Sequence, residues 1–307
     1  MSQKPIVVIA FGGNALIQKG QDGTAEQQME NIKIPMRKVV ALAPDYRVAI
    51  SHGNGPQVGN ILLQQDSTTE VSPMPVDVVG AMTQGQIGYF MEQALERSLA
   101  EAGIERSFLT VITMVEVDAN DPLFQNPTKP IGPFYTEAEA AQKPYRMVVT
   151  DKGHRRVIAS PKPIGVVPYN EIKQLIDLDW IVICSGGGGI PVVKDGDGHR
   201  GVEAVIDKDL ASALLAQEIG ADLFIIATDV SGAAINWGKP DQEMLRKVSL
   251  AEMHRYVEEG QFPAGSMGPK VNALLGFVEA TSKRAIICSI DDIEDAIAGK
   301  AGTEISK

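Results

Sequence analysis

The sequence has few of the residues that would place it in several large protein classes. It contains two cysteines in 307 residues, Cys184 and Cys288, each within an apolar run. Two cysteines cannot form a disulfide framework, so we expect buried structural thiols. Basic residues are outnumbered, with 28 Lys and Arg against 39 Asp and Glu, and the formal charge is −11. This balance argues against nucleic-acid binding and against docking on anionic membranes.

Long apolar stretches are also missing. No run approaches the roughly 18 residues that a membrane helix needs, and Met1 to Pro5 do not have the pattern of a signal peptide. We therefore expect a cytoplasmic protein. The chain has no Walker A sequence, no Cys/His cluster, no H-E-x-x-H and no G-x-S-x-G. A P-loop NTPase, a metal site held by the protein itself and a serine hydrolase are therefore not supported.

What the sequence does contain is an alternation of short runs rich in Val and Ile with longer helical stretches. Near-continuous apolar strands with helices between them imply a mostly parallel sheet covered on both faces. The predicted strands are 6–11, 47–51, 108–115, 180–184, 223–227 and 285–288. The predicted helices are 25–42, 76–102, 171–176, 208–218, 250–258 and 270–279.

One segment breaks this alternation. Residues 117–163 are rich in Pro, Asn, Asp, Lys and Gly, and the segment is too long for a connecting loop in a compact domain. A disordered linker is one interpretation. Apolar residues such as Ile131, Phe134 and Ile158 favour the other interpretation, a small folded excursion that would act as a lid.

Glycine-rich sequences follow several predicted strands, where ligands collect in parallel sheets. Glycines there let backbone N–H groups approach a ligand closely. The sequences are Gly12-Gly13-Asn14-Ala15, His52-Gly53-Asn54-Gly55-Pro56-Gln57-Val58-Gly59, Ser185-Gly186-Gly187-Gly188-Gly189 and Thr228-Asp229-Val230-Ser231-Gly232. Simpler interpretations exist for each: a tight turn at Gly12, a core histidine at His52, a flexible linker at 186–189 and a turn cap at Asp229.

The segment from Gly53 to Gly59 also resembles the glycine loop of dinucleotide-binding folds. That loop should follow the first strand of its unit and be followed, about 20 residues on, by an acidic residue that ends the next strand. Here a polar segment leads into the predicted helix 76–102, and Pro56 is unusual in such a loop. A nicotinamide-dependent oxidoreductase is therefore the weaker hypothesis.

Two lysines lie where the dipole of a helix disfavours a cation. Lys208 begins the predicted helix 208–218, and Lys270, after Pro269, opens the predicted helix 270–279. Because helix N-termini carry partial positive charge, cations there make sense when an anion joins them, and a phosphate is the obvious candidate. Glycine loops and lysines at helix starts together indicate phosphoryl transfer, which needs positioning, charge neutralisation and usually Mg²⁺.

In order along nearly the whole chain, these motifs resemble those of carbamate kinases, a branch of the amino acid kinase family. The resemblance rests on residues 12–16, 52–59, 81–89, 129–134, 186–189, 204–212 and 265–271. It implies an α/β fold, an open, mainly parallel three-layer αβα sandwich with a small protruding subdomain. Residues 1–307 would form a single amino acid kinase domain. Within it, an acceptor-binding N-lobe (1–184) would carry a protruding lid subdomain (117–163), and residues 185–307 would form a nucleotide-binding C-lobe.

The resemblance also implies an activity. Carbamoyl phosphate and ADP would give ATP and carbamate, which breaks down to ammonia and carbon dioxide or bicarbonate, in a reversible reaction with Mg²⁺ carried by the nucleotide. The implied catalytic residues are Lys129, Lys208, Asp209 and Lys270. The implied acceptor-binding residues are Gly12, Gly13, Asn14, Gly53, Asn54 and Gly55. The implied nucleotide-binding residues are Gly187, Gly188, Thr228, Asp229, Val230, Trp237, Met267 and Lys270. A homodimer is the assembly that the family implies.

Two departures and two alternatives accompany this resemblance. Many amino acid kinases have a lysine just before the first glycine pair, where this chain has Ala10-Phe11 as carbamate kinases do, and Lys129 would be the compensating cation. Carbamate kinases often have Asp at the position of Ser231, so we expect a changed detail of the nucleotide site. The alternatives are an amino acid kinase for another carboxylate or a phosphonate, and a non-catalytic nucleotide-binding regulator. Three retained lysines argue against the regulator.

Overall fold

The computed structural model describes residues 3–263 and 265–307, with the backbone but not the side chain of Asn14. Among these residues the main sheet has eight strands, and its pairings are parallel except that of β16 with β17. The strand order is β15 (Lys247–Ser249), β17 (Thr303–Ser306), β16 (Arg284–Ser289), β12 (Leu223–Thr228), β1 (Ile6–Phe11), β2 (Arg47–His52), β9 (Ile181–Ile183) and β3 (Phe108–Thr110). The predicted α/β class with a mainly parallel sheet is therefore confirmed.

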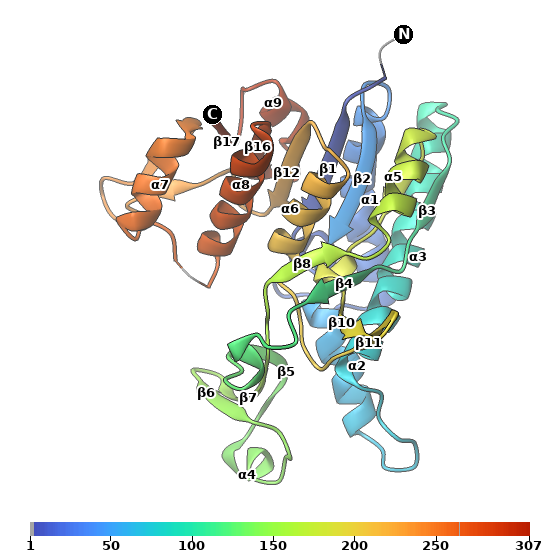
Figure 1. Cartoon of the computed structure of the whole chain (residues 1–307), viewed down its shortest axis with the longest axis vertical. Coiled ribbons are helices and arrows are strands. Elements are labelled where there is room, and N and C mark those ends of the chain that lie inside the picture. The colour runs from blue at the N-terminus through green and yellow to red at the C-terminus, as the bar shows by residue number, and fades with distance from the viewer. Residues whose placement is uncertain (1–2, 264) are drawn as a thin grey trace.

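Helices cover both faces of this sheet (Figure 1). One face packs against α5 (Tyr169–Asp177), α6 (Lys208–Glu218), α7 (Leu250–Glu258) and α8 (Met267–Thr281). The other packs against α1 (Ala25–Leu42), α3 (Val76–Ala102) and α9 (Ile293–Ile297). The three layers follow from strands that are apolar on both sides, since a strand points successive side chains to opposite faces.

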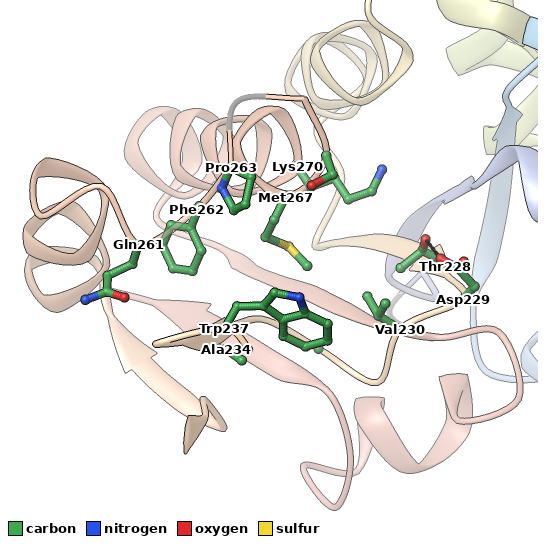
Figure 2. Close-up of a pocket in the computed structure, with 12 residues that line it drawn as sticks. Thr228, Asp229, Val230, Ala234, Trp237, Gln261, Phe262, Pro263, Met267 and Lys270 are labelled. Atoms are coloured by element: carbon green, nitrogen blue, oxygen red, sulfur yellow. Dashed lines mark hydrogen bonds between the residues drawn. The ribbon is translucent and has the colours of Figure 1, made fainter. Parts of the chain in front are cut away.

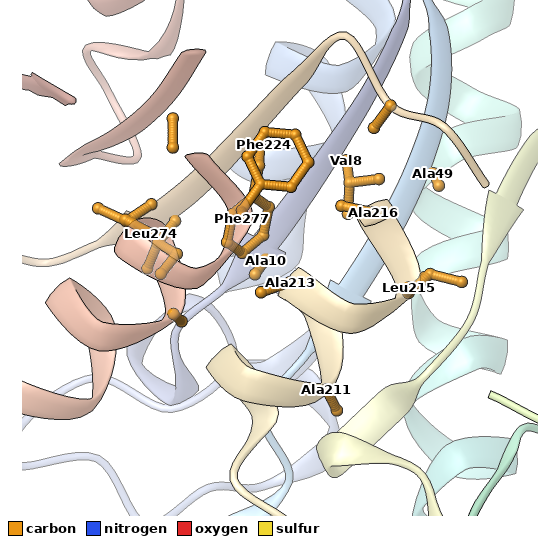
Figure 3. Packing of buried hydrophobic residues seen from close by; sticks show 14 of the residues in the cluster. Val8, Ala10, Ala49, Ala211, Ala213, Leu215, Ala216, Phe224, Leu274 and Phe277 are labelled. Carbon is orange, nitrogen blue, oxygen red and sulfur yellow. The ribbon is translucent and has the colours of Figure 1, made fainter. Parts of the chain in front are cut away.

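The central strand β1 shows this double burial directly. Val8 and Ala10 belong to the core under α6 and α8, while Val7 and Ile9 belong to the core on the opposite face. Figure 3 shows the first of these cores, where Phe224 of β12 and Phe277 of α8 lie side by side, with ring centroids 5.6 Å apart. This contact holds α8 on the same face of the sheet as α6.

The predicted strand 108–115 is wrong, because the chain turns in its middle. Residues 108–110 form β3 of the main sheet, whereas β4 (Met114–Val117) joins a second sheet. At the turn, the side-chain amide of Gln84 both accepts from the Thr113 N–H (2.8 Å) and donates to its carbonyl (3.2 Å). The buried side chain of Gln84 thus hydrogen-bonds the backbone of Thr113 at the turn. The periodicity of the sequence gives no sign of this contact. The second sheet has the order β11 (Gly198–Gly201), β10 (Ile190–Asp195), β4 and β8 (Pro163–Val166).

Two of the differences between the observed and the predicted helices bear on the site. The polar segment after Gly53 forms a helix, α2 (Gly55–Asp66), which was not predicted; Pro56 lies in its first turn, where its missing N–H costs nothing. Helix α8 begins at Met267, so Lys270 lies one turn inside the helix and does not open it.

Residues between β4 and β8 fold as an excursion that projects from the main body in Figure 1. It contains an antiparallel sheet of β5 (Lys129–Tyr135), β7 (Gly153–Ile158) and β6 (Met147–Thr150), with a short helix, α4 (Glu137–Ala140). Its two ends are hydrogen-bonded neighbours, because Val117 of β4 is opposite Pro163 of β8. The small two-stranded ribbon of β13 (Ala234–Ile235) and β14 (Glu243–Met244) lies elsewhere, in the C-terminal half.

The excursion is held against α2 and against the segment before α6. Ile131 and Ile158 form a small apolar cluster with Val76, packed against Leu62 and Val205. At its far end, Asp66 at the end of α2 accepts hydrogen bonds from the Tyr135 hydroxyl (2.9 Å) and the Lys143 ammonium (2.6 Å). These contacts place β5, and with it Lys129, above the carboxyl ends of the main strands. No helix within the described ranges is both long and apolar enough to span a membrane.

The contact between α3 and β3 requires a glycine. A Cβ atom added at Gly88 would lie 2.5 Å from Thr110 Cγ2 and 2.9 Å from Thr110 Cβ, whereas one added at Gly85 on the same helix would meet nothing within 4 Å. Because Thr110 is β-branched and stiff, it cannot turn aside cheaply.

We therefore expect Gly88→Ala to lower the free energy of unfolding by roughly 1–3 kcal/mol through overpacking. The matched variant Gly85→Ala should raise it by up to about 1 kcal/mol, since alanine favours a helix interior over glycine. Urea denaturation of both variants measures the difference. Equal stabilities for the two would contradict the close approach of α3 to β3.

Candidate active site

Two adjoining cavities open at the carboxyl ends of the main strands. The larger, of about 660 Å³, is bordered by the loops after β1 and β2, by the tetraglycine loop, by β5 of the excursion and by the first residues of α6 and α8. The smaller, of about 190 Å³, is bordered by the loop after β12 and by the start of α8. Ser266 and Lys270 line both. The two cavities therefore meet at Lys270.

The smaller cavity has apolar walls with polar groups at one end. Figure 2 shows the indole of Trp237 facing Met267, with Phe262 beside them, while Thr228 and Asp229 lie toward the main sheet. The Thr228 hydroxyl donates to Asp229 Oδ1 (3.0 Å). An aromatic and a thioether side chain around a narrow space suit a flat ring, and the Lys270 ammonium, which extends from this wall, suits an anionic group attached to it.

A buried carboxylate joins the two helix-start lysines. Lys208 Nζ lies 2.5 Å from Asp209 Oδ1, and Lys270 Nζ lies 2.9 Å from Asp209 Oδ2. The side chain of Asp209 is 5% exposed. From the sequence, a bound phosphate was the expected partner of these lysines. The structure shows that the carboxylate of Asp209 also provides a negative charge there. Asp209 holds both ammonium groups at the edge of the larger cavity, which all three residues line.

Burial and charge act in opposite directions on this triad. Burial disfavours the Asp209 carboxylate, but Lys208 and Lys270 outweigh burial, so the pKa of Asp209 is lowered. Burial dominates for Lys208 and lowers its pKa, against the opposing effect of Asp209. The carboxylate therefore stays charged at neutral pH, and an anionic ligand would bring Lys208 the additional negative charge that favours its protonated form.

Three loops that contain glycine meet at the larger cavity. A Cβ at Gly53 would lie 3.4 Å from both Gly13 N and Lys208 Cδ, and a Cβ at Gly187, where φ is +67°, would lie 2.0 Å from Asn54 Nδ2. The Asn54 amide also donates to the Thr83 hydroxyl (2.8 Å). At Gly187 only a glycine allows this approach, and the three loops place backbone and amide groups at the cavity surface beside Lys208.

The remaining predicted residues are distributed as follows. Gly13, Gly53, Asn54, Gly55, Lys129, Lys208, Asp209 and Lys270 line the larger cavity, and Thr228, Asp229, Val230, Trp237, Met267 and Lys270 line the smaller one. Gly187 lines the larger cavity, although the resemblance assigned it to the nucleotide. Gly12 and Gly188 are buried outside both linings: Gly12 donates its N–H to the Ala227 carbonyl (2.8 Å), and Gly188 lies against the Ile206 carbonyl. The side chain of Asn14 lies outside the described part of the structure.

His52 is a core histidine. The residue is 1% exposed, its Nδ1 contacts the Gly53 carbonyl (3.1 Å), and its ring packs against Gly186. Burial lowers the pKa of His52 to about 4, so the ring is neutral at physiological pH.

Three polar residues that line the larger cavity were not predicted from the sequence. Asp207 caps α6 by accepting from the N–H groups of Asp209 and Leu210, and Lys129 Nζ lies 3.6 Å from its other oxygen. Arg155 of β7 reaches the same cavity and donates to the Gly132 carbonyl (3.0 Å). Ser266 is the third. An Asp just before a helix is a recognisable cap signal, but nothing in a basic run such as that around Arg155 says which side chain turns inward.

Together these residues have the chemistry that phosphoryl groups require. Lys129, Arg155, Lys208 and Lys270 place four cations around one cavity, which glycine loops also line and to which a narrow apolar cavity is attached. Fixed charges in a partly buried site stabilise the charge that develops on a transferring phosphoryl group without any proton transfer. Among the described residues, no group of three or more His, Cys, Asp or Glu is placed to hold a metal ion.

Comparisons with known proteins agree with this geometry. A sequence profile of the amino acid kinase family matches residues 5–289. The chain is 51% identical to the carbamate kinase of Thermococcus kodakarensis and 49% identical to that of Pyrococcus furiosus, in each case over 97% of this chain and 98% of the relative. The solved structure of the carbamate kinase from Giardia lamblia bound to AMP-PNP superposes with a TM-score of 0.94 at 43% identity and covers all of both chains.

The Asp209 triad leads to a prediction about stability. Asp209→Asn leaves two largely buried ammonium groups without their counter-charge, and breaking a buried pair in this way costs roughly 3–5 kcal/mol of unfolding free energy. The control is Asp222→Asn, because Asp222 pairs with Lys283 at the surface (2.9 Å, side chains 39% and 50% exposed) and such pairs contribute at most about 1 kcal/mol. Urea denaturation at neutral pH measures both.

The pH dependence of that difference has a definite sign. Since the pKa of Asp209 is lowered in the folded protein, its contribution is complete above the ordinary carboxyl pKa of about 3.9 and is lost as the pH falls through the lowered folded value. The stability gap between the parent and Asp209→Asn should therefore close only in strong acid. A gap that closes near neutral pH would show that another group is responsible.

Proposed function

Because this chain belongs to the carbamate kinases of the amino acid kinase family, we propose that its two cavities carry out reversible phosphoryl transfer between ATP and carbamate. The smaller cavity would hold the adenine nucleotide, with the base against Trp237 and Met267. The larger would hold carbamate or carbamoyl phosphate. The observation that carries the proposal is Lys270, which lines both cavities and is joined to Lys208 through Asp209.

In this proposal, a carbamate oxygen attacks the γ-phosphorus of ATP as the bond to the β-phosphate oxygen breaks. Carbamate is already an anion, so no protein group has to remove a proton. Lys208 and Lys270 would neutralise charge on the transferring group and on the departing ADP. Asp209 would orient the two lysines. The loops carrying Gly12, Gly13 and Asn14 would bind the phosphoryl group, and Gly53, Asn54 and Gly55 the carbamoyl end.

Lys129 and the excursion would complete the acceptor side. Lys129, on the first strand of the excursion, lines the larger cavity as Lys270 does, and its side chain is 46% exposed. A cation that remains this accessible can turn from Asp207 toward an entering anion at little cost. We propose that the excursion acts as a lid that brings this charge to the substrate, and that residues 1–184 and 185–307 form the acceptor and nucleotide lobes on either side.

The chain's own residues fit a metal ion that arrives with the nucleotide. Asp209, which lines the larger cavity, is committed to two lysines. Mg²⁺ commonly keeps several waters and binds mainly through substrate phosphates. When bound, it would neutralise phosphate charge beside Lys208 and Lys270. As to assembly, we expect the homodimer of the family in the cytoplasm; light scattering of the purified protein tests the dimer.

A coupled assay tests the activity. ATP formation from ADP is followed with carbamoyl phosphate as phosphoryl donor, and in parallel with acetyl phosphate. Carbamate kinase activity requires rapid ATP formation with carbamoyl phosphate. A protein that binds ADP but makes no ATP from any donor would be the non-catalytic regulator, and one that prefers another acyl phosphate would be a different kinase of the family.

Lys208→Ala and Lys270→Ala should each reduce turnover strongly. Removing one fixed charge contact from a transition state costs roughly 3–4 kcal/mol, or a factor of 10²–10³ in rate. Steady-state rates at saturating substrates measure the effect. Lys283→Ala is the matched control, since Lys283 is a surface lysine that lines neither cavity. If a site variant keeps more than about half of the parent rate, that lysine does not contact the phosphoryl group.

Lys129→Ala should separate the acceptor side from the nucleotide side. We expect a sharp fall in ATP formation from carbamoyl phosphate, because a cation beside the acceptor is lost, with an ADP affinity close to that of the parent. The fluorescence of Trp237, which lines the smaller cavity, reports ADP binding. Lys152→Ala, in the turn between β6 and β7, is the control. A parent-like rate for Lys129→Ala would mean that Lys129 is an ordinary surface lysine.

A further inference from the structure

The two carboxylate oxygens of Asp207 have different surroundings. Oδ1 accepts the N–H groups of Asp209 (3.0 Å) and Leu210 (3.4 Å) and so caps α6. Oδ2 lies 3.6 Å from Lys129 Nζ, which is beyond hydrogen-bond distance, and within the described residues it accepts no hydrogen bond. The side chain is 20% exposed and lines the larger cavity. The capping role therefore explains one oxygen, while the other, beside the Lys129 ammonium, remains able to accept a hydrogen bond from a ligand in the cavity.

A carboxylate oxygen is an unexpected group at this place. The larger cavity is lined by Lys129, Arg155, Lys208 and Lys270, which suit the oxygens of an anionic ligand. Asp209, the other acidic residue in this lining, is occupied by two lysines. An additional negative oxygen repels an anion unless the ligand also carries an N–H or O–H donor that the oxygen can bind. Asp207 thus favours ligands that have both an anionic and a donor end.

Carbamate and carbamoyl phosphate are ligands of this kind, since each has an amino group on the carbon that carries the reacting oxygen. Acetate and acetyl phosphate have nearly the same shape but a methyl group at that position. We propose that Asp207 Oδ2 accepts a hydrogen bond from the substrate amino group and so selects carbamoyl phosphate against acyl phosphates without a donor. The inference rests on the proposed function and names the residue that determines its specificity.

The placement of Asp207 suits this role. It immediately precedes Lys208, so adjacent residues at the start of one helix would bind the amino group and the transferring phosphoryl group. The Lys129 ammonium lies 3.6 Å from Oδ2, so this oxygen lies beside a cation that would attract the anionic end of the ligand. A site that hydrogen-bonds a substrate N–H disfavours an analogue without it, because the acceptor oxygen then faces a methyl group in place of a donor.

The test compares two phosphoryl donors in the parent and in Asp207→Asn. Asparagine caps helices as well as aspartate does, so Oδ1 keeps its hydrogen bonds, but a donor N–H₂ replaces Oδ2. We expect kcat/KM for carbamoyl phosphate to fall roughly ten- to a hundredfold, with the value for acetyl phosphate unchanged or increased. Where acetyl phosphate turns over too slowly, its inhibition constant against carbamoyl phosphate replaces kcat/KM. Asp207→Ser, which keeps a capping oxygen but is too short to reach, is a second folded variant.

The control variant is Lys129→Ala. It should lower the reactions of both phosphoryl donors together and leave their ratio unchanged, because a cation acts on the anionic end that the donors share. Its behaviour therefore defines what a general effect on the site looks like, against which a change in the ratio is judged.

Three outcomes overturn the inference. Equal losses with both donors in Asp207→Asn would mean that Asp207 only positions Lys129. Equal losses with an increased Mg²⁺ requirement would assign the oxygen to the metal. If both Asp207 variants keep the parent's ratio of kcat/KM for carbamoyl phosphate to kcat/KM for acetyl phosphate, Asp207 does not bind the amino group. A parent protein that makes no ATP from carbamoyl phosphate would instead refute the proposed function itself.

Discussion

The buried contact of Asp209 with Lys208 and Lys270 is the interaction on which the geometry of the site depends. It joins the first residue of α6 to α8, two helices that belong to the same face of the sheet, and it does so at the boundary between the two cavities. A lone carboxylate or a lone ammonium group would be costly at this depth. Together they fix two cations at a defined separation before any ligand arrives, which is the condition for electrostatic stabilisation without reorganisation.

The rest of the fold positions this contact. Strands β1, β2 and β12 are buried on both faces and parallel, so the loops that follow them emerge side by side at one edge. The aromatic pair Phe224 and Phe277 sets α8 on the sheet, and the glycines at 53 and 187 let the opposite loops approach α6. The placement of the cations and of the backbone groups around the larger cavity thus follows from the packing of the helices and loops on the main sheet.

Much of this could be predicted from the sequence, because the signals were local and strong. Strand 6–11 and helix 25–42 have the predicted bounds, and the glycine loops and lysines were recognised from residue type and position. Contacts between distant segments could not be predicted in this way. The turn at Thr113 depends on Gln84, 29 residues earlier, and the inward turn of Arg155 depends on the Gly132 carbonyl. The charge balance at Asp209 depends on Lys270, which is 61 residues away. Periodicity carries none of this information.

The way in which the excursion joins the domain has a consequence for how such a chain can change. Its entry and exit, Val117 and Pro163, are opposite each other on neighbouring strands, so the ends of the inserted segment are held together by the second sheet whatever lies between them. Apart from the contacts that the excursion makes with α2, lengthening or shortening the insert changes its closure entropy by only about 0.6 kcal/mol for each doubling of its length. Charge can therefore be added to or removed from the far wall of the larger cavity by exchanging one appendage, while the parallel sheet and the Asp209 triad stay as they are.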